Sequence, residues 1–191
     1  MASRFLYPVA LNVRGKRCIV VGAGPVGNRK AHALREAGAE VVQLSLEATG
    51  PFQPQQLQDA FLVIAATNDH TVNAAIAQAA RERHVLLNMA SPGDEKDTGD
   101  FATMAPVRRG DLLFGITTGG AGPALAAQLR LELERRYPAS WADYVALLAD
   151  CRKLTRSPDV LRQLVHNTTI RARALDGDSA GAREEAMRCL S

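Results

Sequence analysis

The chain has 191 residues, of which 47% are hydrophobic, and it carries a formal net charge of +3. This is enough for one well-packed core and a smaller appended unit. The sequence contains no run of about 18 apolar residues that could span a membrane. Because the sequence also shows no signal pattern, we expect a cytoplasmic protein. The three cysteines are scattered, which predicts no disulfide framework, and the four histidines lack ligand spacing, which predicts no bound metal. Aromatic residues make up only 5% of the chain, and we expect no nucleic-acid partner.

Strands and helices alternate in the first part of the chain. Short apolar runs, several of them β-branched, predict buried parallel strands at 17–21, 40–44, 61–66 and 85–88. Helical spacing of apolar residues predicts helices at 28–37 and 71–83. The segment 48–54 is rich in glycine, proline and glutamine, so we expect a loop there and a brief helix at 54–59. The alternation predicts an α/β fold with a Rossmann-type, doubly wound parallel sheet.

The second part of the chain is predicted to be mainly helical. We expect a strand at 112–117, helices at 124–136, 141–154 and 160–174, and a charged, weakly apolar tail from 176. The predicted domains are therefore a sheet domain at 1–110, a linking segment at 111–138 and a helical C-terminal domain at 139–191.

The helix at 124–136 has an apolar side formed by Leu125, Leu129 and Leu133. One small domain cannot cover such a face, and small residues at the start of the helix allow close packing. We therefore expect a partner surface there, supplied by a second copy of the chain.

A glycine-rich turn joins the first predicted strand to the first predicted helix. Gly22, Gly24 and Gly27 form the pattern G-x-G-x-x-G, with Pro25 and Val26 between the last two. The first glycine permits a tight turn, the second lets the backbone approach a pyrophosphate, and the third allows the helix to pack closely on the strand. The helix N-terminus then offers free N–H groups to phosphates. The alternative is a tight turn without a ligand, but the flanking strand and helix favour dinucleotide binding.

The residues after the second strand are expected to contact the adenosine ribose of the cofactor. Leu46 and Glu47 occupy this region, and Glu47 lies 20 residues after Gly27. A carboxylate there accepts hydrogen bonds from the ribose 2′-hydroxyl and repels a 2′-phosphate, which favours NAD over NADP. The alternative for Glu47 is a solvated loop residue.

Several further motifs occur in a fixed order along residues 7–136, and together they resemble the precorrin-2 dehydrogenase and sirohydrochlorin ferrochelatase family, which includes the front part of siroheme synthase. The segments that carry the resemblance are 7–16, 22–30, 65–69, 72–73, 88–90, 107–112 and 116–123. The resemblance implies NAD-dependent oxidation of precorrin-2 to sirohydrochlorin. It also implies a homodimer, in which the segment 111–138 carries dimerisation and part of the active site.

The resemblance also implies the residues of the site. Thr67, Asn68 and Asn88 are expected to contact the cofactor. Bifunctional members, which also insert a metal ion, carry an aspartate shortly after the asparagine that corresponds to Asn88, whereas this chain has Ser91 there. We therefore expect dehydrogenation to be retained and ferrochelation to be weak or absent.

The acid–base group is expected to come from the acidic loop that follows. Asp94 is the first candidate and Asp100 the second, and Thr117 is expected to hold the carboxylates of the substrate. The acids of such a loop can equally be solvated surface. Two other functions stay open: a bifunctional dehydrogenase and ferrochelatase, and a non-catalytic sensor that binds NAD.

Overall fold

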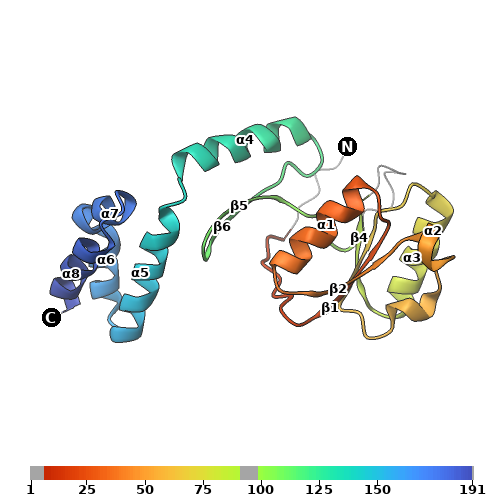
Figure 1. Cartoon of the computed structure of the whole chain (residues 1–191), viewed down its shortest axis with the longest axis horizontal. Coiled ribbons are helices and arrows are strands. Elements are labelled where there is room, and N and C mark those ends of the chain that lie inside the picture. Colours follow the sequence, from red (N-terminus) through yellow and green to blue (C-terminus); the bar gives the residue numbers. More distant parts are fainter. Residues whose placement is uncertain (1–6, 91–98, 191) are drawn as a thin grey trace. The chain divides into compact units, whose positions relative to one another are not determined.

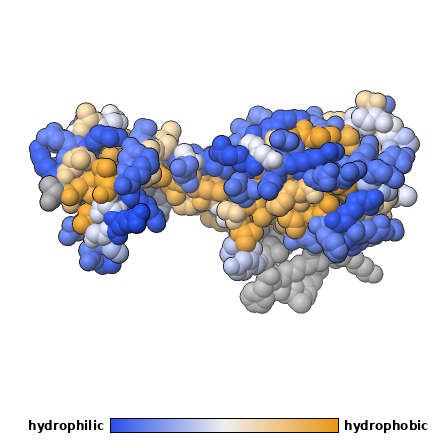
Figure 2. All heavy atoms as spheres, turned by 90° about the horizontal axis from the view of Figure 1, so that it is seen from below, coloured by the Kyte–Doolittle hydropathy of each residue, from blue (hydrophilic) through white to orange (hydrophobic). Residues whose placement is uncertain are grey.

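The computed structural model describes residues 7–90 and 99–190, which form two compact units (Figure 1). The first unit ends at Thr103 and the second begins at Met104. Patches of apolar surface lie among hydrophilic surface on both units (Figure 2). In the described part of the chain, no helix is long and apolar enough to cross a membrane.

The first unit is built around a four-stranded parallel sheet, as predicted. Its strand order is β2-β1-β3-β4. The strands are β1 (Arg17–Val21), β2 (Glu40–Leu44), β3 (Leu62–Ala65) and β4 (Leu86–Met89). Helices α1 (Pro25–Glu36) and α3 (His70–Glu82) cover opposite faces of the sheet (Figure 1).

The alternation of side chains along β1 explains these two layers. Ile19 and Val21 pack in the core on the α3 side, whereas Cys18 and Val20 pack in a second core with Ala31 of α1. All four of these side chains are fully buried. A strand buried on both faces reads as a continuous apolar run, which is why the sequence pattern identified it.

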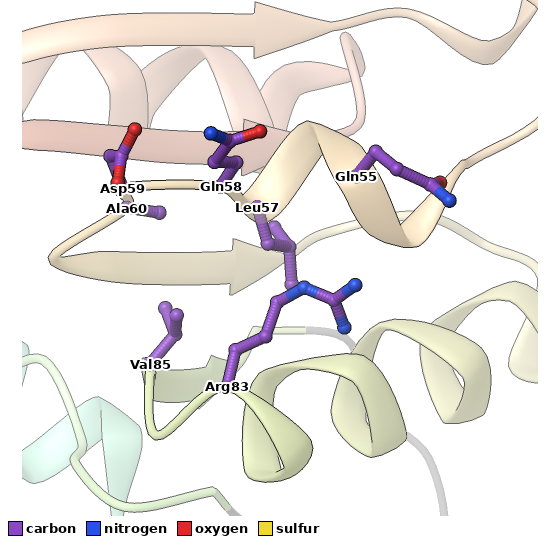
Figure 3. A pocket seen from close by; sticks show the side chains of 7 residues that line it. All are labelled: Gln55, Leu57, Gln58, Asp59, Ala60, Arg83 and Val85. Carbon is purple, nitrogen blue, oxygen red and sulfur yellow. The ribbon is translucent and has the colours of Figure 1, made fainter.

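The connection between β2 and β3 has a brief helix where one was predicted at 54–59, but the predicted loop at 48–54 begins inside a short helix that was not predicted. It contains the short helix α2 (Leu46–Thr49) and the 3-10 helix η1 (Pro54–Leu57). Between η1, the end of α3 and the amino ends of β3 and β4 lies an open hollow of about 500 Å³ (Figure 3). Ligands of parallel α/β sheets bind at the carboxyl ends of the strands, which is the opposite edge.

The second unit begins with an antiparallel hairpin of β5 (Ala105–Arg109) and β6 (Leu112–Ile116). Strand β5 was not predicted. The helix α4 (Pro123–Arg136) follows, and none of its residues is buried within the described chain. The Arg109 guanidinium holds the end of α4, donating hydrogen bonds to the carbonyl oxygens of Glu134 (3.1 Å) and Tyr137 (2.6 Å).

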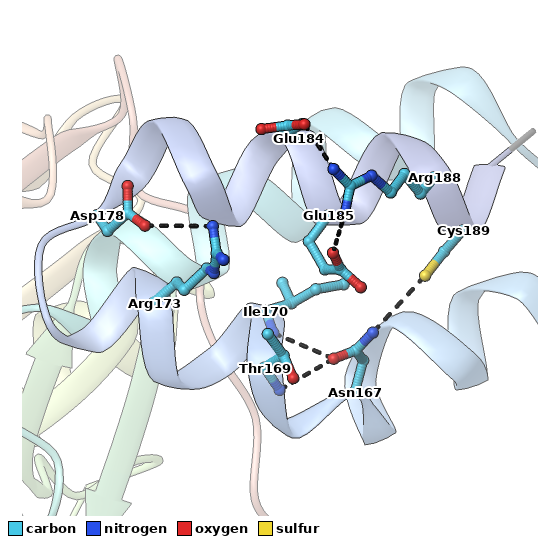
Figure 4. A network of polar contacts seen from close by, with 9 residues as sticks. All are labelled: Asn167, Thr169, Ile170, Arg173, Asp178, Glu184, Glu185, Arg188 and Cys189. Carbon is cyan, nitrogen blue, oxygen red and sulfur yellow. Dashed lines mark hydrogen bonds and ion pairs between the residues drawn. The ribbon is translucent and has the colours of Figure 1, made fainter.

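Four helices with their own core complete the second unit. They are α5 (Trp141–Leu154), α6 (Pro158–His166), α7 (Thr168–Leu175) and α8 (Ser179–Leu190). The single helix predicted at 160–174 is wrong, because Asn167 ends α6 and caps α7 through the N–H groups of Thr169 and Ile170 (Figure 4). The charged, weakly apolar tail from 176 belongs to the predicted helical domain, and it contains α8, which buries Ala182 and Ala186.

Candidate functional site

The candidate site lies where the connections from the sheet diverge. Strand β1 pairs with β2 on one side and with β3 on the other, and the helices that follow β1 and β3 lie on opposite faces. Ligands of doubly wound sheets bind at the carboxyl edge of such a switch point. Two loops meet there, because a Cβ atom at Gly22 would lie 2.3 Å from the carbonyl oxygen of Ala66.

The glycine loop has the geometry that the motif predicts. Gly22 has φ +123°, a backbone conformation that residues with a side chain rarely adopt. A Cβ at Gly27 would lie 2.2 Å from the Gly22 carbonyl oxygen. Gly24 differs, because no atom of the other described residues, apart from its two neighbours in the chain, lies within 4 Å of the position of its Cβ. The backbone at Gly24 is therefore open to a ligand, whereas Gly22 and Gly27 are required by the turn itself.

Helix α1 presents its N-terminus at this open position. Gly24 is its N-cap and Pro25 opens its first turn. Within the described chain, no side chain caps the helix and its first turn contains no acidic residue. The first N–H groups thus keep their partial positive charge for an anion, and the 12-residue helix supplies an aligned dipole.

A residue that the sequence analysis missed supports this loop. The Gln43 side chain on β2 donates hydrogen bonds to the Gly22 carbonyl oxygen (3.0 Å) and to Asn28 Oδ1 (2.8 Å). It ties the loop and the first turns of α1 to the neighbouring strand. The contact depends on the register between β1 and β2, so local sequence patterns carry no signal for it.

The loop after β3 is held by its own side chains. Thr67 is buried, and its hydroxyl donates to Asn73 Oδ1 (2.7 Å) while the Asn73 amide donates to the Thr67 carbonyl oxygen (3.0 Å). Asp69 caps α3 by accepting from the N–H groups of Thr71 and Val72. Asn68, between them, is exposed. The loop is therefore rigid, and Asn68 is its side chain open to a ligand.

Asn88 occupies the carboxyl end of β4 and is 5% exposed. Its amide donates a hydrogen bond to the Phe101 carbonyl oxygen (2.7 Å), whereas its Oδ1 is buried with no hydrogen-bond partner among the described residues. A buried acceptor without a donor is costly. Asn88 thus offers one unused acceptor close to the crevice.

Glu47 lies in the first turn of α2 and is exposed, and Leu46 beside it packs against the core on the α3 side. The carboxylate is therefore accessible to a ligand that extends past the end of β2.

The structure places the predicted catalytic residues in different surroundings. Asp94 lies outside the described residues. Asp100 has a structural contact, because its carboxylate accepts a hydrogen bond from the Leu87 N–H (2.9 Å) while its own N–H donates to the Leu87 carbonyl oxygen (2.8 Å). Thr117 belongs to the second unit, where its exposed hydroxyl accepts from the Gly119 N–H (3.2 Å).

Cationic side chains near the glycine loop lie on α1. Arg29 is exposed. Lys30 is half-buried and donates a hydrogen bond to the Thr103 hydroxyl, and its pKa is lowered by burial and, to a smaller extent, by the neighbouring Arg29. Lys30 therefore holds the chain end of this unit against α1, while Arg29 is available to an acidic ligand.

These features fit a dinucleotide. The open backbone at Gly24 and the start of α1 suit a pyrophosphate. The Asn88 Oδ1 atom, which has no partner in residues 7–90 and 99–190, suits a donor elsewhere on the ligand. In residues 7–90 and 99–190, no three His, Cys, Asp or Glu side chains form a group that could hold a metal ion.

Comparisons with known proteins agree with this geometry. Residues 9–105 match the family described as "Putative NAD(P)-binding". The chain is 30% identical to siroheme synthase of Methylobacillus flagellatus over 96% of its own length and 44% of that protein, and 37% identical to siroheme synthase 1 of Pectobacterium atrosepticum over 70% and 30%, respectively. It thus spans less than half the length of these curated relatives.

A solved structure shares the fold over nearly the whole chain. The structure of SirC, a precorrin-2 dehydrogenase, superposes with a TM-score of 0.72 at 24% identity, covering 97% of this chain and 98% of that one. The likeness extends through both units, including the helices of the second unit.

Proposed function

The chain belongs to the NAD(P)-binding family that its residues 9–105 match, and on this premise we propose that it is an NAD-dependent dehydrogenase that oxidises precorrin-2 to sirohydrochlorin. The observation that carries the cofactor assignment is the open backbone at Gly24 at the start of α1. The substrate assignment is supported by the similarity to siroheme synthases, which extends over 96% of the chain. It is also supported by the motifs at 88–90 and 107–123, which a general NAD-binding domain does not need.

In the proposed reaction, precorrin-2 loses a hydride and a proton, and the products are sirohydrochlorin, NADH and H⁺. When bound, NAD accepts the hydride. The first N–H groups of α1 bind the pyrophosphate and Gln43 holds their loop in place. Positioning the ring carbon against the cofactor supplies much of the rate.

A carboxylate is needed to take the proton, and we propose Asp94 for this role, with Asp100 as the second candidate. The contact between the Asp100 carboxylate and the Leu87 N–H favours Asp94, because Asp100 already holds the chain against β4. Thr117 is proposed to hold substrate carboxylates, and Thr67, Asn68 and Asn88 are proposed to contact the cofactor. Glu47 and Leu46 would adjoin the adenosine ribose, and Glu47 would select NAD over NADP.

We further propose a cytoplasmic homodimer in which α4 forms part of the contact between the two copies. No residue of α4 is buried within the described chain, and Leu125 and Leu131 are 52% and 46% exposed. Leu113 on the adjoining hairpin is 43% exposed. Exposed apolar side chains on a helix without buried residues are typical of a surface that a partner covers.

The experiment that tests the activity is incubation with precorrin-2 and NAD, with and without a divalent metal ion. We expect NADH to form, together with the absorbance of sirohydrochlorin, in both reactions. The Gly24→Leu variant is the control, since its pyrophosphate site is blocked. No NADH from the wild-type chain would contradict the proposal, and rapid metal insertion would show that Ser91 does not abolish ferrochelation.

A further inference from the structure

We propose that Asn88 holds the nicotinamide riboside half of the cofactor by accepting a hydrogen bond on its buried Oδ1 atom. The inference rests on the proposed binding of NAD and assigns one atom of the protein to one half of that ligand. Nothing in the glycine motif specifies it.

The orientation of the Asn88 amide is determined by its neighbour. The Phe101 carbonyl oxygen can only accept, and it lies 2.7 Å from Asn88 Nδ2. Turning the amide over would place two acceptors against each other. The atom without a partner among the described residues is therefore the oxygen, and the group that would pair with it must be a donor.

The segment that follows the acidic loop holds Asn88 rigidly. Gly99 forms an antiparallel bridge with Asn88, and a Cβ at Gly99 would lie 2.4 Å from the Leu87 carbonyl oxygen. Asp100 then binds the Leu87 N–H through its carboxylate. A side chain held in this way presents its free acceptor in one direction, which is what a positioned ligand contact needs.

The place of Asn88 in the sheet selects the half of the ligand. In the proposed binding mode, the pyrophosphate would lie over the end of β1 and the adenosine ribose over the end of β2. The other half must then extend past β3 to β4, on the opposite side of β1. Strands lie about 4.8 Å apart, so the end of β4 is about 10 Å from β1, which is within reach of a nicotinamide riboside.

The donors in this half are the ribose hydroxyl groups and the carboxamide NH₂ of nicotinamide. Three ligands separate them: ADP lacks both groups, ADP-ribose adds the ribose, and NAD adds the nicotinamide. Calorimetry of the wild-type chain with all three ligands gives the reference. The variants Asn88→Leu, which keeps the branched shape of the side chain, and Asn88→Ala remove the acceptor.

In both variants we expect the affinity for NAD to fall about 10-fold, because one hydrogen bond is lost. The affinity for ADP should stay within about twofold of the wild type. A loss that begins with ADP-ribose identifies a ribose hydroxyl as the donor, and a loss confined to NAD identifies the carboxamide. The matched control is Gln43→Leu, which should weaken all three ligands by a similar factor because it acts on the glycine loop.

The inference is overturned if the Asn88 variants bind NAD as well as the wild type does, or lose ADP and NAD equally. A wild-type chain that binds none of the three ligands would instead contradict the proposed function. Should both variants fail to fold, the affinity of the wild type for NAD is compared with its affinity for 3-acetylpyridine adenine dinucleotide, which lacks the NH₂. Its affinity for ADP-ribose is compared with that for ADP. Neither added group improving affinity would then overturn the inference.

Discussion

Gly27 packs against Gly22 so closely that a Cβ atom at Gly27 would lie 2.2 Å from the Gly22 carbonyl oxygen. The carbonyl oxygen is backbone and also accepts the Gln43 hydrogen bond, so it cannot move aside cheaply. The third glycine of the motif is thus a requirement of folding, whereas the second, Gly24, faces open space.

This contrast gives a pair of opposite predictions. Gly27→Ala should lower the free energy of unfolding by about 1–3 kcal/mol, the usual cost of overpacking, as measured by urea titration. Gly24→Leu should lose less stability than Gly27→Ala, at most about 1 kcal/mol because leucine is a poorer N-cap than glycine. It should nevertheless lose about 10- to 100-fold in NAD affinity, because the side chain excludes phosphate from charge-assisted hydrogen bonds. Undiminished NAD affinity in Gly24→Leu would place the pyrophosphate elsewhere.

The exposed Glu47 carboxylate predicts a preference for NAD over NADP. A 2′-phosphate beside a carboxylate is repelled, so Glu47→Gln should reduce the preference about tenfold or more, mainly by improving affinity for NADP. The affinities of the wild type and of Glu47→Gln for NAD and NADP check this. Equal binding of the two cofactors by the wild type would remove Glu47 from the ribose site.

Elements with a strong apolar period could be predicted from the sequence, whereas those that depend on partners could not. Strand β5 contains Pro106 and two arginines, and it becomes a strand only by pairing with β6. Helix α8 buries alanines, which give a weak hydrophobic signal. At Asn167 a side-chain cap competes with continuation of the helix, so one predicted helix became two.

The same distinction applies to the site. The glycine loop is readable because backbone geometry demands glycine at fixed spacing. Gln43 meets Gly22 only through strand register, and Asn88 meets Phe101 across 13 residues of chain. Contacts of this kind exist only in the folded chain, so no local pattern signals them.

Burial of Cys18 predicts a dependence of stability on pH. The thiol is fully buried in β1, and burial raises its pKa from 9.0 to about 11. The folded state therefore holds the proton more tightly than the unfolded state. This stabilisation is complete below pH 9 and is lost as the pH rises from 9 to 11, by at most about 2–3 kcal/mol.

The measurement is urea unfolding of the wild type and of Cys18→Ala at pH 8 and at pH 10.5. Other groups titrate in both proteins, so the difference between them isolates Cys18. The wild type should lose more stability than the variant over this interval. Parallel losses would show that the Cys18 thiol ionises alike in both states.

The exposed leucines of α4 predict a homodimer. Light scattering at micromolar concentration should give twice the chain mass of 20.5 kDa. Leu125→Glu, which places a charge on a side chain that is 52% exposed, should shift the mass to that of one chain. Leu154→Glu on α5, where Leu154 is 63% exposed, is the matched control and should stay dimeric. A wild-type monomer would contradict the prediction.

The acid–base role can be assigned by comparing Asp94 with Asp100, because the structure gives Asp100 another task. Its carboxylate accepts from the Leu87 N–H, and an asparagine can keep that hydrogen bond through its own oxygen. If Asp100 only holds the chain, Asp100→Asn should retain most of the dehydrogenase kcat, whereas Asp100→Ala should unfold at lower urea concentration. If Asp94 takes the proton, Asp94→Asn should reduce kcat about 10²- to 10⁴-fold, the usual contribution of a general base, with NAD affinity unchanged. A large loss of kcat in Asp100→Asn together with normal stability would transfer the role to Asp100. Unchanged rates in both asparagine variants would show that neither carboxylate takes the proton.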